Sequence, residues 1–265
     1  MLSGLLLGSG SAAAANAEGN ATGREAARAD FPLMDLHVHR SEELTMGEIA
    51  AKARTMEIGV VENIAPWGIT CDEELRAYIE AVRPYPVYVG LQPMSPGWSA
   101  NLSPELIAQA DYVAMDPQIV ENGNSYGETV RLWEYTAYID DAEAFMERNM
   151  QHYMDILGGE ERLDVFACPF FLPVCIQREY HRLWTRRRLE QVVEAAQARG
   201  IAIEINDTAH VPHEEFILMA KRAGLKFTFG SDARNHTVGR LDYCKRVARR
   251  CRLTEKDFFL PRRRG

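Results

Sequence analysis

The chain carries Asp35-Leu36-His37-Val38-His39 near its start and Gly230-Ser231-Asp232 near its end. The first stretch has the apolar character of a strand that ends in a His-x-His pair. Side chains two residues apart on a strand point to the same face, so His37 and His39 can offer two imidazole nitrogens to one metal ion. Asp232 follows another apolar run and is predicted to lie at a strand end as well. Two histidines and a carboxylate with an open position are typical of hydrolytic metal sites.

Between these two stretches the sequence alternates short apolar runs with helical segments. The predicted strands are 33–39, 58–62, 87–92, 112–115, 163–167, 201–205 and 225–229. The helices between them have local start and stop signals, such as the capping box of Thr45 and Glu48 and the terminating Gly200. Strand–helix repeats imply parallel strands with right-handed crossovers. Because polar residues follow nearly every strand, we predict an α/β fold, a distorted seven-stranded (β/α)7 barrel of the TIM-like kind, with its site at the carboxyl ends of the strands.

The polar side chains that follow the predicted strands should therefore converge. They are His37/His39, Glu62-Asn63, Gln92, Asp116, Cys168, Glu204/Asn206 and Asp232. Simpler interpretations exist for each: the histidines can be hydrogen-bonded in an unused cleft, and Asp232 can be a helix N-cap. Glu62 and Asp116 are either acids that move protons at the site or carboxylates that cap the next turn. Glu204 either pairs with a cation inside the barrel or takes part in catalysis.

Composition limits the classes of partner. The net charge of −8 argues against nucleic-acid binding, and no apolar stretch is long enough to span a bilayer, so we expect neither nucleic acid nor membrane as a partner.

Residues 1–30 are interpreted as a possible signal remnant and linker, and residues 31–265 as a single barrel domain. The apolar run 2–7 and Ala15-Asn16-Ala17 resemble the back half of an export signal without its positive start. The protein is exported or periplasmic if that signal is genuine and truncated, and cytoplasmic otherwise.

The whole pattern resembles the PHP superfamily, named for polymerase and histidinol phosphatase domains. Asp35-Leu36-His37-Val38-His39 is similar to the opening motif of that family, Val87-Tyr88-Val89-Gly90-Leu91 to its third strand, and Phe229-Gly230-Ser231-Asp232-Ala233 to its last. The resemblance extends from about residue 34 to residue 259. It implies a distorted seven-stranded barrel that hydrolyses phosphate esters with up to three bound metal ions.

The chain departs from the family at most of the other ligand positions. Gln92 stands where the family has a bridging glutamate, and Arg234 where it has a histidine after the last strand. The remaining replacements are Glu62-Asn63, Gln118 and Cys168. A neutral amide makes a bridged metal pair unfavourable, and a guanidinium repels a further cation. The resemblance therefore implies a divergent member with a reduced site of His37, His39, Asp232 and the Gln92 amide oxygen.

These features predict a PHP-like metal-dependent hydrolase, phosphoesterase-like, with one divalent ion (Zn, Mn or Fe) that activates water. Arg234 is predicted to clamp an anionic small-molecule substrate, and Glu62 or Asp116 to handle the proton. The aromatic residues Trp67, Trp98 and Trp133 are predicted to line the substrate pocket, unless they only form the apolar cluster that long connections need. The alternative is a catalytically inactive PHP-fold protein that binds a carbohydrate or another small ligand, with or without a metal.

Overall fold

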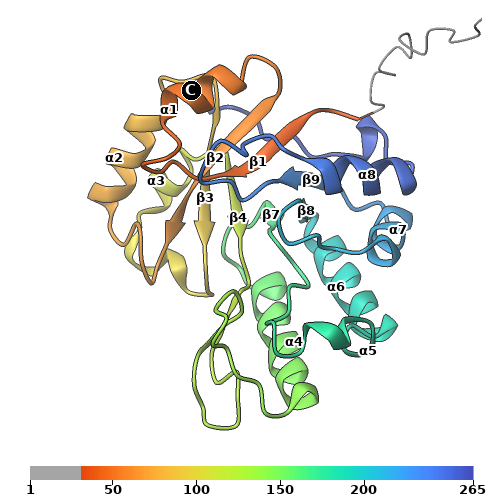
Figure 1. Cartoon of the computed structure of the whole chain (residues 1–265). Helices are drawn as coiled ribbons and strands as arrows, with labels where there is room; N and C mark the ends of the chain where they lie inside the picture. Colours follow the sequence, from red (N-terminus) through yellow and green to blue (C-terminus); the bar gives the residue numbers. More distant parts are fainter. Residues whose placement is uncertain (1–30, 265) are drawn as a thin grey trace, which may run out of the picture.

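The predicted strands form one parallel sheet that curls into a nearly closed barrel (Figure 1). The structure, a computed structural model, describes residues 31–264, so the predicted signal remnant and linker at 1–30 lies outside the described residues. The strands of the barrel are β1 (Met34–Val38), β2 (Glu57–Ile64), β3 (Tyr88–Pro93), β4 (Tyr112–Met115), β7 (Val165–Phe166), β8 (Ala202–Asn206) and β9 (Phe227–Gly230). They are neighbours in this order, and every pair is parallel. The predicted α/β barrel is confirmed.

The two edge strands, β1 and β9, meet at their carboxyl ends and close the barrel there. Val38 forms an isolated parallel bridge with Ala233, and the His39 N–H donates to the Ala233 carbonyl at 2.9 Å. Asp35 is fully buried and accepts hydrogen bonds from the N–H and the hydroxyl of Ser231, at 2.9 and 2.6 Å. These bonds hold the end of β1 against the connection that follows β9. They bring residues 35–39 and residues 230–232 together.

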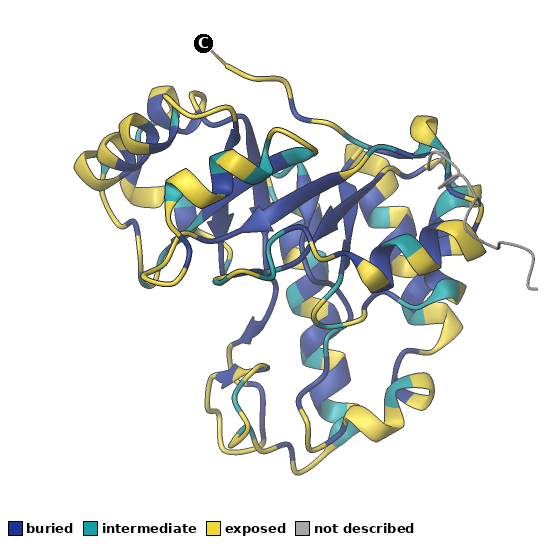
Figure 2. Cartoon of the chain, turned by 45° about the horizontal axis from the view of Figure 1, so that its top comes forward, coloured by how far each residue is buried: buried dark blue, intermediate teal, exposed yellow. Residues whose placement is uncertain are grey.

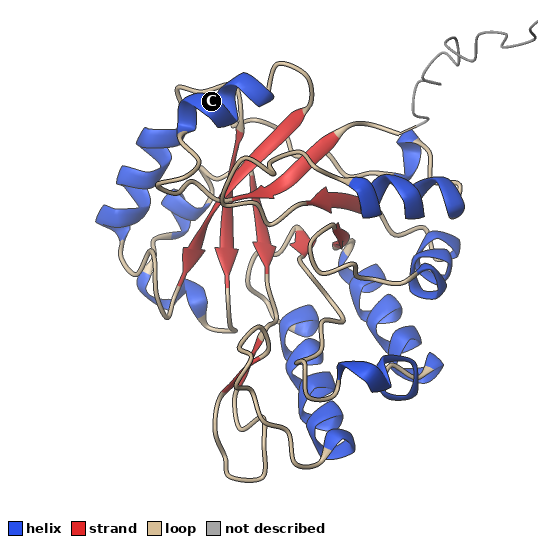
Figure 3. Ribbon diagram, viewed as in Figure 1, coloured by secondary structure: helices blue, strands red, loops and turns tan. Residues whose placement is uncertain are grey.

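Helices cover the outside of the barrel, and strands and helices alternate along most of the chain (Figure 3). The helices are α1 (Met46–Lys52), α2 (Asp72–Val82), α3 (Pro104–Ile107), α4 (Ala142–Gly158), α5 (Tyr180–Leu183), α6 (Arg186–Arg199), α7 (Glu214–Arg222) and α8 (Asp242–Arg250). The predicted capping box of Thr45 and Glu48 starts α1, and Gly200 ends α6 with φ 67°. Figure 2 shows the strands buried and the outer faces of the helices exposed. Within residues 31–264, no helix has both the length and the apolar character that a membrane crossing requires.

The long connection between β4 and α4 contains a small hairpin. In it, β5 (Ile119–Val120) pairs antiparallel with β6 (Val130–Arg131). The connection extends beyond the barrel beside α4, as the lime-green loop of Figure 1, and Arg148 of α4 holds it by donating to the Gly123 carbonyl at 3.2 Å. Strands of two residues have no alternation that a sequence pattern can detect, so this hairpin was not predicted.

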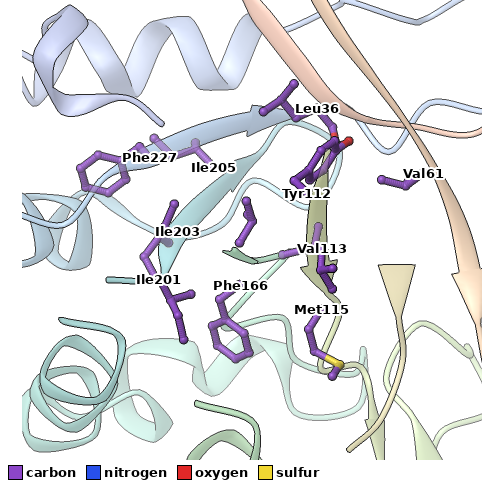
Figure 4. Packing of buried hydrophobic residues seen from close by; sticks show 14 of the residues in the cluster. Leu36, Val61, Tyr112, Val113, Met115, Phe166, Ile201, Ile203, Ile205 and Phe227 are labelled. Atoms are coloured by element: carbon purple, nitrogen blue, oxygen red, sulfur yellow. The ribbon is translucent and has the colours of Figure 1, made fainter. Parts of the chain in front are cut away.

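The ring of Tyr112, at the start of β4, lies inside the barrel and limits which residues fit around it (Figure 4). Its hydroxyl donates to the Leu36 carbonyl at 2.5 Å. A Cβ on Gly59 would lie 2.2 Å from the Tyr112 hydroxyl oxygen, and a Cβ on Gly90 would lie 2.4 Å from the ring carbon Cζ. Strands β2 and β3 therefore need glycine where they pass the tyrosine.

Replacement of Gly90 by alanine is expected to destabilise the fold, because the new methyl group overlaps a fully buried ring. Overpacking of this kind costs about 1–3 kcal/mol of unfolding free energy, which urea unfolding measures. Gly158→Ala is the matched control, since no heavy atom lies within 4 Å of an added Cβ there. Equal unfolding free energies for the two variants would contradict this account of the barrel interior.

Candidate functional site

His37, His39 and Asp232 come together at the carboxyl end of the barrel. One ligand atom of each residue lies within 4.8 Å of the others, and the Nε2 atoms of both histidines lie 3.5 Å from Asp232 Oδ1. The histidines are buried, with 2% and 5% of their surface exposed. The convergence predicted from the His-x-His spacing and from Asp232 is therefore present, in a geometry that can hold a metal ion.

The backbone at Asp232 explains how its carboxylate meets β1. Asp232 has φ 54°, a left-handed conformation that is uncommon outside glycine, although aspartate tolerates it better than most residues. Ser231, just before it, is anchored by its two hydrogen bonds to Asp35. The anchored turn ends β9 and directs the carboxylate toward the histidines. Unusual backbone of this kind persists where the surroundings enforce it, often at functional sites.

Two buried polar atoms at this group lack hydrogen-bond partners, which fits a metal ion. His39 Nε2 makes no hydrogen bond, and burial, together with the charges of His37 and Arg234, lowers the pKa of His39 well below its usual value. Gln92 Oε1 is also without a partner, while Gln92 Nε2 lies 3.0 Å from His37 Nε2. A half-turn of the Gln92 amide would place its oxygen, in place of Nε2, beside that nitrogen. Imidazole, carboxylate and amide oxygen together suit a divalent transition metal.

Glu204 of β8 holds His37 from the side opposite the metal group. Its two carboxylate oxygens lie 3.0 and 3.1 Å from His37 Nδ1, and they also accept from the Cys168 N–H and from Asn206 Nδ2, each at 2.9 Å. Burial alone lowers the pKa of His37, but the carboxylates of Glu204 and Asp232 outweigh it and raise the pKa to about 10. Because Nδ1 faces Glu204, Nε2 is the atom left for a metal, as in other carboxylate–histidine–metal arrangements.

Gly230, the last residue of β9, provides the space for this pair. An added Cβ would lie 1.9 Å from Glu204 Oε1 and 2.6 Å from His37 Cβ. The sequence left Glu204 open between a structural ion pair and catalysis. Its position shows that it contacts a candidate ligand directly, and the strand alternation of Glu204 with Asn206 was the signal that it faces the interior.

A cavity of about 410 Å³ lies over the metal group. Its lining consists of Asn63, Trp67, Gln92, Met94, Asp116, Gln118, Trp133, Asp232 and Arg234. Arg234 forms an ion pair with Asp232 through Nη1 and Oδ1, and half of its side chain is exposed. The cavity therefore brings together a candidate metal group, the half-exposed guanidinium of Arg234 and the side chains of Trp67 and Trp133.

Asp116 lies in the wall of this cavity. It accepts hydrogen bonds from the Gln118 N–H at 3.1 Å, from Gln118 Nε2 at 3.2 Å and from Gln92 Nε2 at 3.3 Å. Burial raises the pKa of Asp116 to about 8, although the positive charge of His37 acts in the opposite direction. A carboxyl group of this kind can hold or release a proton near neutral pH.

Two predicted site residues do not reach the cavity. Asn63 pairs in register with Gln92, whereas Glu62 pairs with Leu91. Since successive strand residues face opposite sides, Asn63 enters the cavity and Glu62 faces away from it, 3.4 Å from Arg40 Nε. Trp98 begins the short 3-10 helix Trp98–Asn101 and is buried in the hydrophobic core. Asn63 was among the polar residues expected to converge, and Gln118 was noted at a replaced ligand position. Neither was assigned to the substrate pocket that both of them line; the alternation along β2 was the available signal for Asn63.

No family model matches the sequence, and no curated protein matches it. The fold is similar to the crystal structure of a histidinol phosphate phosphatase from Lactococcus lactis subsp. lactis Il1403, complexed with zinc, L-histidinol and phosphate. That match has a TM-score of 0.57 at 15% identity and covers 85% of this chain and 95% of that one. A chain in the cryo-EM structure of archaeal ribonuclease P with mature tRNA matches with a TM-score of 0.41 at 10% identity, over 82% of this chain and 89% of that one. At these identities, the likeness to the phosphatase shows a shared barrel fold.

Proposed function

We propose that this chain is a PHP-like metal-dependent hydrolase that cleaves phosphate monoesters at a single metal centre. The observation that carries the proposal is the group of His37, His39 and Asp232 beneath a cavity that Arg234 also lines. The barrel that the chain shares with a histidinol phosphate phosphatase supports the proposal at the level of fold. The zinc and phosphate in that structure indicate which ligands to test first.

The ligands of the proposed centre are His37 Nε2, His39 Nε2, an Asp232 carboxylate oxygen and the Gln92 amide oxygen. Glu204 keeps the Nδ1 proton of His37 in place, which leaves the Nε2 lone pair for the ion. Zinc, manganese and iron all accept such a donor set. A bound divalent ion supplies Lewis-acid stabilisation of a phosphoryl oxygen and lowers the pKa of water at its open position.

The other residues of the cavity bind the substrate and move the proton. Arg234 binds the phosphate by charge-assisted hydrogen bonds; its half-exposed guanidinium is free to turn from Asp232 toward an anion. Asp116 exchanges a proton with the attacking water or with the leaving oxygen, held in place by the N–H donors of Gln118. Glu62 takes no part, because it faces away from the cavity.

The proposal is tested by metal content and hydrolysis together. Purified protein is expected to bind close to one equivalent of manganese or zinc, to hydrolyse phenyl phosphate in that form, and to lose the activity with a chelator. A full metal complement without hydrolysis of any phosphate monoester would contradict the proposed hydrolase activity. Tight binding of a small ligand without metal and without turnover would instead support the alternative, a catalytically inactive binding protein.

Replacement of Arg234 by glutamine is expected to weaken substrate binding without loss of metal. A hydrogen bond to a charged group contributes about 1.5–3 kcal/mol, so kcat/KM for phenyl phosphate should fall by about 10- to 100-fold, mostly through KM. Arg250→Gln is the matched control, because Arg250 of α8 pairs with Glu214 at 2.9 Å, away from the cavity lining. An unchanged KM in Arg234→Gln would count against the anion-binding role.

A further inference from the structure

Part of the cavity wall neither holds the metal ion nor exchanges a proton in the proposed hydrolysis. The residues in question are Asn63, Trp67, Met94, Gln118 and Trp133. They come from β2 and the connections after β2, β3, β4 and β6, and therefore from separate parts of the chain. Three kinds of group are combined in this wall: flat aromatic rings, neutral amides and one thioether. Such a wall suits the part of a phosphate monoester that leaves with the ester oxygen.

The two tryptophans form a fixed aromatic corner. Their ring centroids lie 6.0 Å apart with an angle of 78° between the planes. The guanidinium of Arg131 lies 5.4 Å from the Trp67 ring centroid and is itself paired with Glu134 at 3.1 Å. Trp133 keeps 40% of its surface exposed, so a ligand that covers it would bury apolar surface favourably. A flat, apolar ring face is the complement of this corner.

The amides of the wall suit a partner that both donates and accepts hydrogen bonds. Asn63 and Gln118, which line the cavity, each offer a carbonyl oxygen and an amino group. A ligand hydroxyl satisfies either end, because it can donate to the oxygen or accept from the amino group. Several amides in one wall therefore match several hydroxyls on one ligand.

We infer that the substrate of the proposed hydrolase is a sugar phosphate, that is, the phosphate monoester of a polyhydroxylated ring. The apolar C–H face of the ring stacks against Trp133 and Trp67, and its hydroxyls meet Asn63 and Gln118. The cavity of about 410 Å³ lies within the usual range for small-molecule sites. The inference rests on the proposed function for the phosphate, while the ring site depends only on the wall residues.

Simpler phosphate esters can make only some of the contacts that this wall offers. Phenyl phosphate has a flat ring but no hydroxyl, so it leaves the amides without partners. Glycerol 2-phosphate has hydroxyls but no ring face to cover the tryptophans. A site built to hydrogen-bond hydroxyl groups discriminates strongly against analogues that lack them. Comparison of these two esters with sugar phosphates therefore separates the contributions of the two halves of the wall.

The test measures kcat/KM of the manganese-loaded protein for a panel of hexose and pentose monophosphates, phenyl phosphate and glycerol 2-phosphate. The best sugar phosphate is expected to exceed both simple esters by at least about tenfold. Trp133→Ala should lower kcat/KM for that sugar phosphate by about tenfold and for glycerol 2-phosphate by less than about twofold. Asn63→Ala should lower kcat/KM for the sugar phosphate by a larger factor than for phenyl phosphate. Tyr135→Ala is the control, because Tyr135 is 91% exposed in the same connection as Trp133.

The outcomes separate this inference from the proposed function. Phenyl phosphate hydrolysed as efficiently as every sugar phosphate would overturn the inference and leave the hydrolase standing. If no ester is hydrolysed, calorimetric titration of the metal-free protein with the same sugar phosphates decides the matter. Binding that Trp133→Ala weakens and Tyr135→Ala does not would sustain the sugar site without the enzyme. A failure of every sugar phosphate to bind would overturn it.

Discussion

Replacement of His39 by phenylalanine is expected to empty the metal centre while the barrel stays folded. His39 contributes a nitrogen lone pair and few other interactions there, because its Nε2 makes no hydrogen bond and lies 3.5 Å from Asp232 Oδ1. Structural zinc sites with four ligands bind with roughly 10–16 kcal/mol, so loss of one ligand removes on the order of 3 kcal/mol, which is about 100-fold in affinity. Hydrolysis should fall at least as far. Phenylalanine keeps a ring of similar size, so the unfolding free energy should change by less than about 1.5 kcal/mol.

Metal content by mass spectrometry, kcat/KM for phenyl phosphate and urea unfolding of the metal-free protein measure these effects. His236→Ala is the matched control, because His236 is an exposed histidine in the same connection as Asp232 but does not line the cavity. A His39→Phe protein that retains a full equivalent of metal would eliminate the proposed centre. A variant that fails to fold would show a structural role for His39, which the missing hydrogen bond argues against.

Replacement of Glu204 should have the second large effect, on stability and on metal binding together. Glu204→Ala leaves three buried donors without an acceptor, on His37, Cys168 and Asn206. Removal of one partner of a buried ion pair costs about 3–5 kcal/mol, which urea unfolding of the metal-free protein measures. Glu204→Gln retains the size and one acceptor oxygen, so its loss of stability should be smaller, about 1–3 kcal/mol. Its metal affinity should still fall about 10- to 100-fold, because the carboxylate no longer orients His37.

Rescue by the conservative variant distinguishes orientation of His37 from simple packing. If Glu204 only fills space, Glu204→Gln should bind metal as tightly as the wild-type protein, and the proposed positioning role would be wrong. Glu62→Gln is the control, because Glu62 contacts Arg40 on the outer side of β2. Its metal affinity and kcat/KM should remain unchanged, and its stability should change by less than about 0.5 kcal/mol. A large loss of activity in Glu62→Gln would restore the catalytic role predicted for that residue.

The barrel was predictable because its signals are local. Strand β4 (Tyr112–Met115) has the predicted bounds, and the other strands agree with the prediction to within a few residues. The predicted strand 163–167 is shorter in the structure, as Val165–Phe166. Capping residues such as Thr45 and Asp141 place the helices between the strands. The hairpin of β5 and β6 and the four-residue helix α5 (Tyr180–Leu183) were missed, since such short elements depend on long-range contacts rather than on a pattern.

The candidate site was predictable in part. Parallel strands deliver their carboxyl ends to one side of a barrel, so residues after different strands had to be close, and His37, His39 and Asp232 are. Which of two adjacent residues enters the cavity depends on register. A shift of one residue exchanges the two faces of a strand, and the pairing of Asn63 with Gln92 is what turns Glu62 outward. Likewise, Trp67 and Trp133 line the cavity while Trp98 joins the core, although all three follow strands.

By itself, the sequence determined the barrel and the meeting of two histidines with one aspartate, because both follow from periodicity and from the parallel direction of the strands. Only the tertiary structure decided which side chains surround that group. The contact of Glu204 with His37, the space left by Gly230, and the wall of amides and tryptophans arise from packing between residues far apart in the chain. Such contacts depend on distances of a few ångströms between separate strands and loops, and no local pattern of residues encodes those distances.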